Sequence, residues 1–311
     1  MPAVTDRSSL PPLESPDRAR TRRPVEHVRR AIRTTEGAGF VVRRPIPGID
    51  PGRSDPFLLL DHMGPVTYAP REAVGAPDHP HRGFETVTYL LDGELEHKDS
   101  HGGGGVLRAG DTQWMTAGAG LVHSEMPSER IRRHGGTVHG VQLWVNLPAA
   151  DKFTPPRYQD LRADRLTRLR SPDGGALVRL IAGSLGDHEG PGRTHTPITY
   201  AHASIDPGHV LEVPWDPEQS ALLYVLSGEG RAGPDATPVA ESDLAVLGEG
   251  EVVSVAGEGA EPLEVLLLGG RPLREPVAQY GPFVMTTKAQ IAEAIDDYHA
   301  GRMGRIAART G

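Results

Sequence analysis

The sequence predicts an all-β protein of two stacked antiparallel barrels followed by a short C-terminal helix. Three observations predict it: short β-forming runs separated by turn dipeptides, a second half that repeats the turn pattern of the first, and a change to helical periodicity near the C-terminus. The chain has 311 residues, and its 38 glycines and 29 prolines suit a fold with many tight turns.

The first barrel is predicted over residues 27–150 by a hairpin pattern in its centre. Residues 87–91 are a β-forming run, and Asp92-Gly93 follows with a dipeptide suited to a tight two-residue turn. Residues 94–99 return as an alternating polar strand, and residues 106–115 add one or two more. Short antiparallel strands of this kind indicate a small barrel.

The second barrel is predicted over residues 151–285 by internal repetition. Residues 223–229 parallel residues 88–94 at an offset of 135, and residues 239–243 parallel residues 107–111 at an offset of 132. Self-similarity at a nearly constant offset is typical of duplicated units. We therefore expect two barrels of related topology.

Two segments lie outside the predicted barrels. Residues 1–26 are rich in Pro, Arg, Ser and acidic residues with almost no apolar periodicity, which predicts a disordered leader. Residues 286–311 are predicted to form a helix and tail. Thr287 to Gln290 fit a capping box, and Ile291, Ile295 and Tyr298 share one helical face.

Composition excludes several classes of protein. The net charge of −8 argues against direct nucleic-acid binding, which requires a basic face. The absence of cysteine excludes a disulfide framework, a thiolate zinc site and an iron–sulfur cluster. No apolar run approaches the ~20 residues that span a bilayer, and the N-terminus has no signal-peptide core. We expect a cytoplasmic protein without a membrane partner.

Two short motifs predict a metal site in the first barrel. They are His79-Pro80-His81 and His123-Ser124-Glu125. Residues two apart in a strand point to the same face, so each motif places two metal-competent side chains together. If the two strands are neighbours, three imidazoles and a carboxylate converge, a set that suits a first-row divalent metal.

The motifs around these residues resemble a known family. The pattern Gly75-x3-His79-x-His81-x3-Glu85-x7-Gly93, followed by Gly110 and Gly120-x2-His123, resembles the two motifs of the cupin superfamily. The stretches DPFLLLDHMGP, HPHRGFETVTYLLDG, GDTQWMTAGAGLVHSEMP and YGPFVMTT look like the pirin family, from about Val28 onward. The resemblance implies two stacked cupin (jelly-roll-type) β-barrels, of which only the first holds a metal.

The resemblance also implies the ligand set. The pirin pattern uses His79, His81, His123 and Glu125, whereas the general cupin motif uses Glu85. Strand parity would also permit Glu85 to face the metal, so its exclusion rests on the resemblance. Iron is the first candidate for the metal, and nickel, cobalt, manganese or zinc also suit these donors.

The duplicated half is expected to lack the ligands. The two offsets carry His79 and His81 onto Pro214 and Asp216, and His123 onto Val255. None of these three residues offers an imidazole. The copy therefore keeps its turns and loses its metal site.

The family resemblance implies an oxidoreductase similar to quercetin 2,3-dioxygenase. Its substrates would be a flavonol such as quercetin and O2, with ring cleavage and loss of carbon monoxide, and Glu125 would be both ligand and catalytic base. The alternative is a non-enzymatic, metal- and redox-dependent regulator that binds a transcription factor or a metabolic enzyme. An open apolar cavity at the metal favours catalysis, and an exposed apolar face beside a closed site favours the regulator.

Other residues near the motifs leave alternatives open. Phe57, Phe84 and residues 113–115 either line an apolar cavity at the metal or form ordinary barrel core. His97 could lie close behind the metal ligands, but a surface position is favoured. Arg82 is expected to point away from the pocket and to support a loop.

Overall fold

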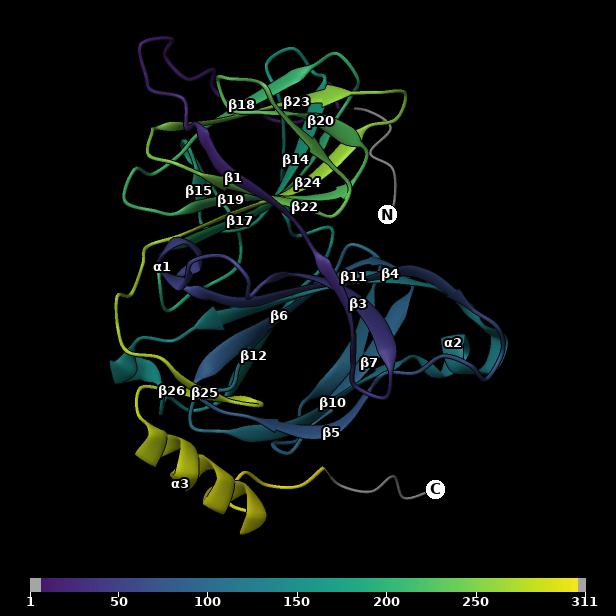
Figure 1. Cartoon of the computed structure of the whole chain (residues 1–311). Helices are drawn as coiled ribbons and strands as arrows, with labels where there is room; N and C mark the ends of the chain where they lie inside the picture. Colours follow the sequence, from purple (N-terminus) through teal and green to yellow (C-terminus); the bar gives the residue numbers. More distant parts are fainter. Residues whose placement is uncertain (1–6, 307–311) are drawn as a thin grey trace.

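The computed structural model describes residues 7–306 and has two stacked β-barrels with a helix beneath the first (Figure 1). The predicted all-β fold with two barrels and a C-terminal helix is confirmed. Each barrel consists of a seven-stranded and a four-stranded antiparallel sheet. Among the described residues, no helix has the length and apolar character needed to cross a membrane.

In the first barrel the seven-stranded sheet has the order β12-β9-β6-β11-β4-β3-β2, and the four-stranded sheet has the order β5-β10-β7-β8. The strands are β2 (Ile32–Glu36), β3 (Phe40–Ile46), β4 (Phe57–Tyr68), β5 (Ala76–His81), β6 (Phe84–Asp92), β7 (Glu94–Asp99), β8 (Gly104–Arg108), β9 (Thr112–Thr116), β10 (Leu121–Pro127), β11 (Gly136–Asn146) and β12 (Arg157–Leu161). The predicted turn at Asp92-Gly93 joins β6 to β7, and Gly93 has the positive φ of 91° that such a turn requires.

The second barrel repeats this arrangement with sheets β1-β22-β19-β24-β17-β14-β13 and β18-β23-β20-β21. Its strands are β1 (Val25–Arg30), β13 (Thr167–Arg170), β14 (Ala176–Ala182), β17 (Ile198–Ile205), β18 (Val210–Pro214), β19 (Ala221–Ser227), β20 (Glu229–Ala232), β21 (Thr237–Ala240), β22 (Asp243–Leu247), β23 (Val252–Glu258) and β24 (Leu263–Gly270). Two small hairpins are β15 (Ser184–Leu185) with β16 (His188–Glu189), and β25 (Ala278–Tyr280) with β26 (Phe283–Met285).

The helices are α1 (Pro51–Ser54), α2 (Glu129–His134) and α3 (Lys288–His299), with a 3₁₀ turn at Ala149–Asp151. Helix α3 begins with the predicted capping box of Thr287 and Gln290. It packs under the first barrel together with the β25–β26 hairpin, although the chain reaches it from the second barrel (Figure 1).

The two barrels exchange an edge strand. β1 precedes the first barrel in the chain but pairs with β22 of the second, while β12 precedes the second barrel but pairs with β9 of the first. β12 lies within the range predicted for the second barrel, so the expected boundary at residue 150 does not coincide with the division between the sheets. Each half of the chain thus completes a sheet of the other.

The prediction of a disordered leader is corrected for the described part of residues 1–26; residues 1–6 lie outside the described residues. Leu13 is 2% exposed in the core of the second barrel. The Arg23 guanidinium, 3% exposed, donates hydrogen bonds to the carbonyl oxygens of Gly248, Asp216 and Gln219. The segment is held by a few irregularly spaced buried residues such as Leu13 and Arg23. Its overall composition therefore remains that of a solvated tail.

The two seven-stranded sheets pack face to face through one apolar layer. On β6, Val87, Tyr89 and Leu91 point into this layer, and on β24 of the opposite sheet Leu266 and Leu268 do so. Strand alternation turns the intervening residues of β6, such as Thr88, toward the interior of the first barrel. A separate apolar cluster fills the second barrel. The first barrel is therefore the one whose interior is free to hold polar groups.

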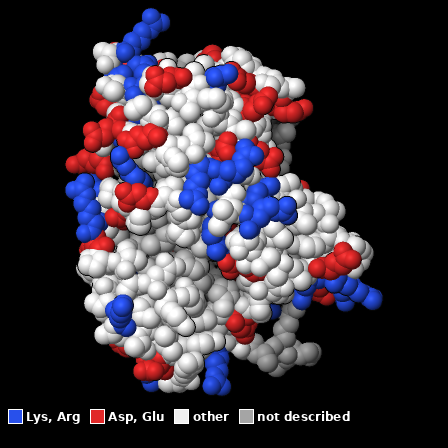
Figure 2. All heavy atoms as spheres, viewed as in Figure 1, with Lys and Arg blue, Asp and Glu red and all other residues white. Residues whose placement is uncertain are grey.

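Charges add less to the contact between the barrels. On the face in Figure 2, basic side chains gather at the waist between the barrels, in the region of β1 and β3. Arg43 of β3 forms an ion pair with Glu241 at 2.9 Å, and the Glu241 side chain is 52% exposed. Exposed pairs of this kind contribute about 0–1 kcal/mol each, so the apolar layer dominates the contact.

Two histidine–tyrosine contacts cross the apolar layer in opposite directions. His62 Nδ1 lies 3.1 Å from the Tyr224 hydroxyl, and His202 Nδ1 lies 2.9 Å from the Tyr89 hydroxyl. In the first sheet His62 and Tyr89 flank Val141, and in the second sheet His202 and Tyr224 flank Leu266 in the same way. The contacts are thus equivalent under an approximate twofold relation between the halves.

We expect Tyr89→Phe to destabilise the protein by about 1–3 kcal/mol, because His202 loses a hydrogen-bond partner in a buried layer. Urea unfolding measures the change in the free energy of unfolding. Tyr280→Phe is the matched control, since Tyr280 is 68% exposed. Equal stability of Tyr89→Phe and Tyr280→Phe would show that the contact across the layer contributes nothing.

Candidate metal centre

The two predicted histidine motifs lie on neighbouring strands. β5 pairs with β10 in a register that places His79 opposite His123 and His81 opposite Leu121. One ring nitrogen from each of His79, His81 and His123 lies within 4.8 Å of the others. The structure therefore brings three of the four predicted donors to one point.

The hydrogen bonds of these histidines fit a bound metal. His79 Nδ1 is 2.7 Å from the carbonyl oxygen of Pro77, and His81 Nδ1 is 3.4 Å from that of Pro282. A proton held on Nδ1 by a carbonyl leaves Nε2 as a lone-pair donor. His123 is 1% exposed, and neither of its ring nitrogens has a hydrogen-bond partner in the described structure. Unpaired nitrogens in such a place are costly, and coordination of a cation would satisfy one.

Electrostatics keep the cluster in the neutral form that ligation requires. Burial lowers the pKa of His81 and of His123 well below its ordinary value, and the neighbouring histidines lower it further. Neutral imidazole is the metal-binding form. The residues present thus fit a divalent metal on both geometry and protonation.

Glu125 lies beside the three histidines rather than within their cluster. A register shift falls between His123 and Glu125 on β10, and such irregularities redirect side chains. The Thr88 hydroxyl lies 2.7 Å from Glu125 Oε1 and donates to it. Burial raises the pKa of Glu125, while Thr88 and His79 oppose the rise.

Glu85 is turned away from the cluster. It shares the face of β6 that carries Val87 and Tyr89, which pack between the barrels. Its Oε1 accepts a hydrogen bond of 2.6 Å from the Thr116 hydroxyl. Phe84, its neighbour in sequence, faces the other way and contacts the His81 ring at a centroid distance of 5.1 Å. The sequence left open whether Glu85 faces the metal site, and in the structure it does not.

A cavity of about 660 Å³ ends on His79, His81 and Glu125. Its walls come mainly from β3, β4, β5 and β11 and are largely apolar, with Phe40, Leu59, Met63, Val138 and Trp144 among them. None of the residues considered for this role from the sequence lines the cavity, although Phe84 contacts both His81 and the wall residue Trp144. Phe57 and Trp114 pack between the barrels, and Met115 packs against Leu121. Alternation along β4 and β9 decides their direction.

Two family models match this chain, one in each barrel. The family model described as Pirin matches residues 39–145, and the Pirin C-terminal cupin domain matches residues 200–304, which together exceed half of the chain. The chain belongs to the pirin family.

Relatives of this pirin family member have similar lengths. A pirin-like protein of Solanum lycopersicum is 43% identical over 270 residues, with 86% of this chain and 89% of that protein covered. A structure described as quercetin 2,3-dioxygenase from Acinetobacter baumannii is 38% identical with a TM-score of 0.86, covering 92% of this chain and 99% of its own. The Escherichia coli pirin YhhW, solved with nickel(II), is 20% identical with a TM-score of 0.60 and coverages of 79% and 99%. At this low identity the similarity to YhhW supports the fold only.

The second pirin barrel has aliphatic residues at the ligand positions. Leu211 pairs with Val255 and Val213 with Val253, as His79 pairs with His123 and His81 with Leu121 in the first barrel. The expected match of His123 with Val255 agrees with this alignment. Pro214 and Asp216 were expected to match His79 and His81, and this is corrected to Leu211 and Val213. The offset of 135 residues relates β6 to β19, whereas the offset of 132 residues relates β5 and β10 to β18 and β23.

The loop after His81 is braced by two buried cations. Arg82 Nε donates to the carbonyl oxygen of Ala119, and its Nη2 donates to Asp297 of α3, both at 2.6 Å. This agrees with the expectation that Arg82 supports a loop. Lys152, 1% exposed, donates from Nζ to the carbonyl oxygens of Gly83 and Val284 at 2.8 and 3.0 Å. The C-terminal hairpin and helix of the pirin fold thus hold the histidine loop in place.

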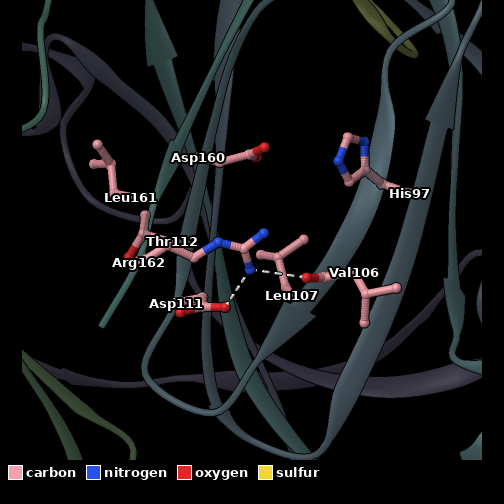
Figure 3. A pocket seen from close by; sticks show the side chains of 8 residues that line it. All are labelled: His97, Val106, Leu107, Asp111, Thr112, Asp160, Leu161 and Arg162. Atoms are coloured by element: carbon pink, nitrogen blue, oxygen red, sulfur yellow. Dashed lines mark hydrogen bonds and ion pairs between the residues drawn. The ribbon is translucent and has the colours of Figure 1, made fainter. Parts of the chain in front are cut away.

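His97 is buried behind the ligands, and the sequence favoured a surface position for it. It is 3% exposed on β7, opposite Glu125, and its ring stacks on Tyr158 at 5.3 Å. His97 also lines a small space of about 10 Å³, where Arg162 binds Asp111 and the carbonyl oxygen of Val106 (Figure 3). That volume is at the lower limit for one water molecule, so it offers no second ligand site.

We expect the stability of this pirin to rise relative to Lys152→Met as the pH increases. Burial lowers the pKa of Lys152 from 10.5 to about 8, so between these values the unfolded chain holds a proton that the folded protein has released. The stability gap should therefore widen by about 3 kcal/mol from below pH 8 to about pH 10.5. Urea unfolding at several pH values measures it. Lys288→Met is the control at an exposed lysine, and a gap independent of pH would contradict the argument.

Proposed function

We propose that this chain is a metal-dependent dioxygenase that cleaves a flavonol such as quercetin with O2 and releases carbon monoxide. The observation that carries the proposal is the cavity of about 660 Å³ that ends on Glu125 and on His79 and His81, two of the three clustered histidines. Its volume is typical of small-molecule sites, and its walls suit flat aromatic rings. The similar Acinetobacter baumannii protein is described as a quercetin 2,3-dioxygenase, which supports the same activity here.

In this proposal one divalent metal is held by His79, His81, His123 and Glu125. Three neutral imidazoles and a carboxylate suit iron first, and nickel, cobalt, manganese or zinc as well. A bound metal would supply Lewis acidity that lowers the pKa of a coordinated hydroxyl, and a common binding point for substrate and O2. A substrate in the cavity would lie beside His79, His81 and Glu125, which line it.

The residues of the chain prepare the substrate. Glu125 accepts the proton of the flavonol 3-hydroxyl, a role suited to a carboxylate whose pKa is raised by burial. The Thr88 hydroxyl holds the Glu125 carboxylate in position. Leu59, Met63 and Trp144 on the cavity wall exclude water and contact the rings. Both atoms of O2 enter the opened ring, and the flavonol itself supplies the electrons.

The regulatory alternative is supported less. A redox-dependent regulator would need no deep apolar cavity at its metal, whereas catalysis on an aromatic substrate does. The cavity reaches three of the four predicted ligands, His79, His81 and Glu125. It is this feature that favours turnover over partner binding.

The test is oxygen-dependent loss of quercetin absorbance by protein loaded separately with Fe(II), Ni(II), Co(II), Mn(II) or Zn(II). We expect loss of absorbance and release of carbon monoxide in air with at least one metal, and neither under argon. His123→Ala should abolish both because it removes a donor, whereas His101→Ala in an exposed loop should not. Failure to consume quercetin with every metal would overturn the proposal.

We expect Thr88→Val to weaken divalent-metal affinity about 10–100-fold, the usual cost of losing a group that orients a ligand. The hydroxyl that positions Glu125 is lost, while the shape of the side chain is kept. Metal affinity is measured by competition with a chromophoric chelator. Thr86→Val, two residues away on the same buried strand, is the control. Equal affinity of Thr88→Val and wild type would contradict a ligand role for Glu125.

A further inference from the structure

Resting on the proposed function, we propose that a polar clamp in the cavity wall selects flavonols by their ring hydroxyl groups. The clamp consists of Glu36 on β2, Arg44 on β3 and Asp61 on β4, three adjacent strands of the first barrel. All three residues line the cavity that ends on His79, His81 and Glu125. In a wall that is otherwise mostly apolar, this group is a concentrated set of donors and acceptors.

The clamp is rigid before any ligand arrives. Arg44 Nε donates to Asp61 Oδ1 at 2.6 Å and Nη2 to Asp61 Oδ2 at 2.5 Å, a bidentate pair. Arg44 Nη2 also donates to Glu36. Asp61 is only 5% exposed, so the pair is fixed in the wall rather than on a mobile surface. A fixed group loses little entropy when it binds a ligand.

The clamp keeps unused hydrogen-bonding capacity. Within the described chain no partner is found for Arg44 Nη1 or for Glu36 Oε2, and the Glu36 side chain is 42% exposed. A free N–H donor beside a free carboxylate acceptor matches a hydroxyl group, which accepts one hydrogen bond and donates another. The formal charge of the three side chains is −1. A neutral hydroxyl therefore fits, and a carboxylate or sulfonate on the substrate would be repelled.

The clamp lies at a useful separation from the metal ligands. Asp61 pairs across the sheet with Gln142, and Gln142 pairs with Thr88, which contacts Glu125. Two strand spacings separate Asp61 from Thr88, which is about 10 Å. A fused two-ring system carrying a third ring can span that length. A flavonol with its 3-hydroxyl at Glu125 would therefore bring the hydroxyls of its far ring to the clamp.

The test compares quercetin with 3-hydroxyflavone, which has the same rings but only the hydroxyl at the metal end. Dissociation constants are measured by fluorescence titration of zinc-loaded protein under argon, so that binding is separated from turnover. We expect wild type to bind quercetin at least about tenfold more tightly, since hydrogen bonds to charged groups exceed neutral ones. A quercetin analogue carrying a sulfonate on the far ring should lose this advantage.

Glu36→Gln should remove about tenfold from quercetin affinity and leave 3-hydroxyflavone affinity unchanged. Arg44→Lys, which keeps the charge but loses the planar fork, should do the same. Glu241→Gln is the matched control, because Glu241 pairs with the adjacent Arg43 and does not line the cavity. Equal binding of the two flavonols by wild type, no binding of either, or equal losses for both in Glu36→Gln would overturn the clamp.

Turnover of 3-hydroxyflavone in air separates the two proposals. If the metal-loaded protein consumes 3-hydroxyflavone while Glu36→Gln leaves the preference for quercetin intact, the dioxygenase stands and the clamp is wrong. If neither flavonol is consumed but the preference depends on Glu36 and Arg44, the clamp stands and the dioxygenase is wrong.

Discussion

The apolar layer between the two seven-stranded sheets is the constraint on which the metal site depends. A small barrel must normally fill its own interior with apolar side chains, as the second barrel does. Both barrels bury apolar side chains in the layer between them, such as Val87 and Tyr89 from the first and Leu266 and Leu268 from the second, but the other apolar residues of the first barrel form only smaller clusters. This leaves room for polar groups in the interior of the first barrel, where β6 presents Thr88 to Glu125 on the face opposite Val87 and Tyr89.

Duplication explains why one barrel lacks a site. Leu211 and Val255 occupy the positions of His79 and His123, so in the second barrel aliphatic packing stands where the first barrel has its candidate metal ligands. The exchanged strands β1 and β12 tie the two barrels together, because neither half of the chain forms a complete sheet of its own. We therefore expect the first barrel, with its candidate metal site, and the apolar second barrel to fold together.

Features that depend on local strand periodicity could be predicted from the sequence. Features that depend on loop lengths or on packing between distant strands could not. The two His motifs follow from the period of two, and the three imidazoles indeed converge. Strand parity alone left Glu85 open, since only the packing of β6 between the barrels shows which face is interior. Transferring one offset to Pro214 and Asp216 was wrong because loop lengths differ between the halves. The cavity wall could not be found, because Arg44 and Asp61 lie far from the motifs in the chain.

The buried Lys152 beside the histidine loop needs its own explanation, because ionic groups in a protein interior are usually destabilising. A buried ion pair repays its desolvation only with good geometry and full hydrogen bonding, and apolar replacements are often more stable. Lys152 has no carboxylate partner among its hydrogen bonds, only the carbonyl oxygens of Gly83 and Val284 and the amide of Asn146. Its lowered pKa records the cost. Such a cost is tolerated where position matters more than stability, and these contacts fix the loop that carries His81.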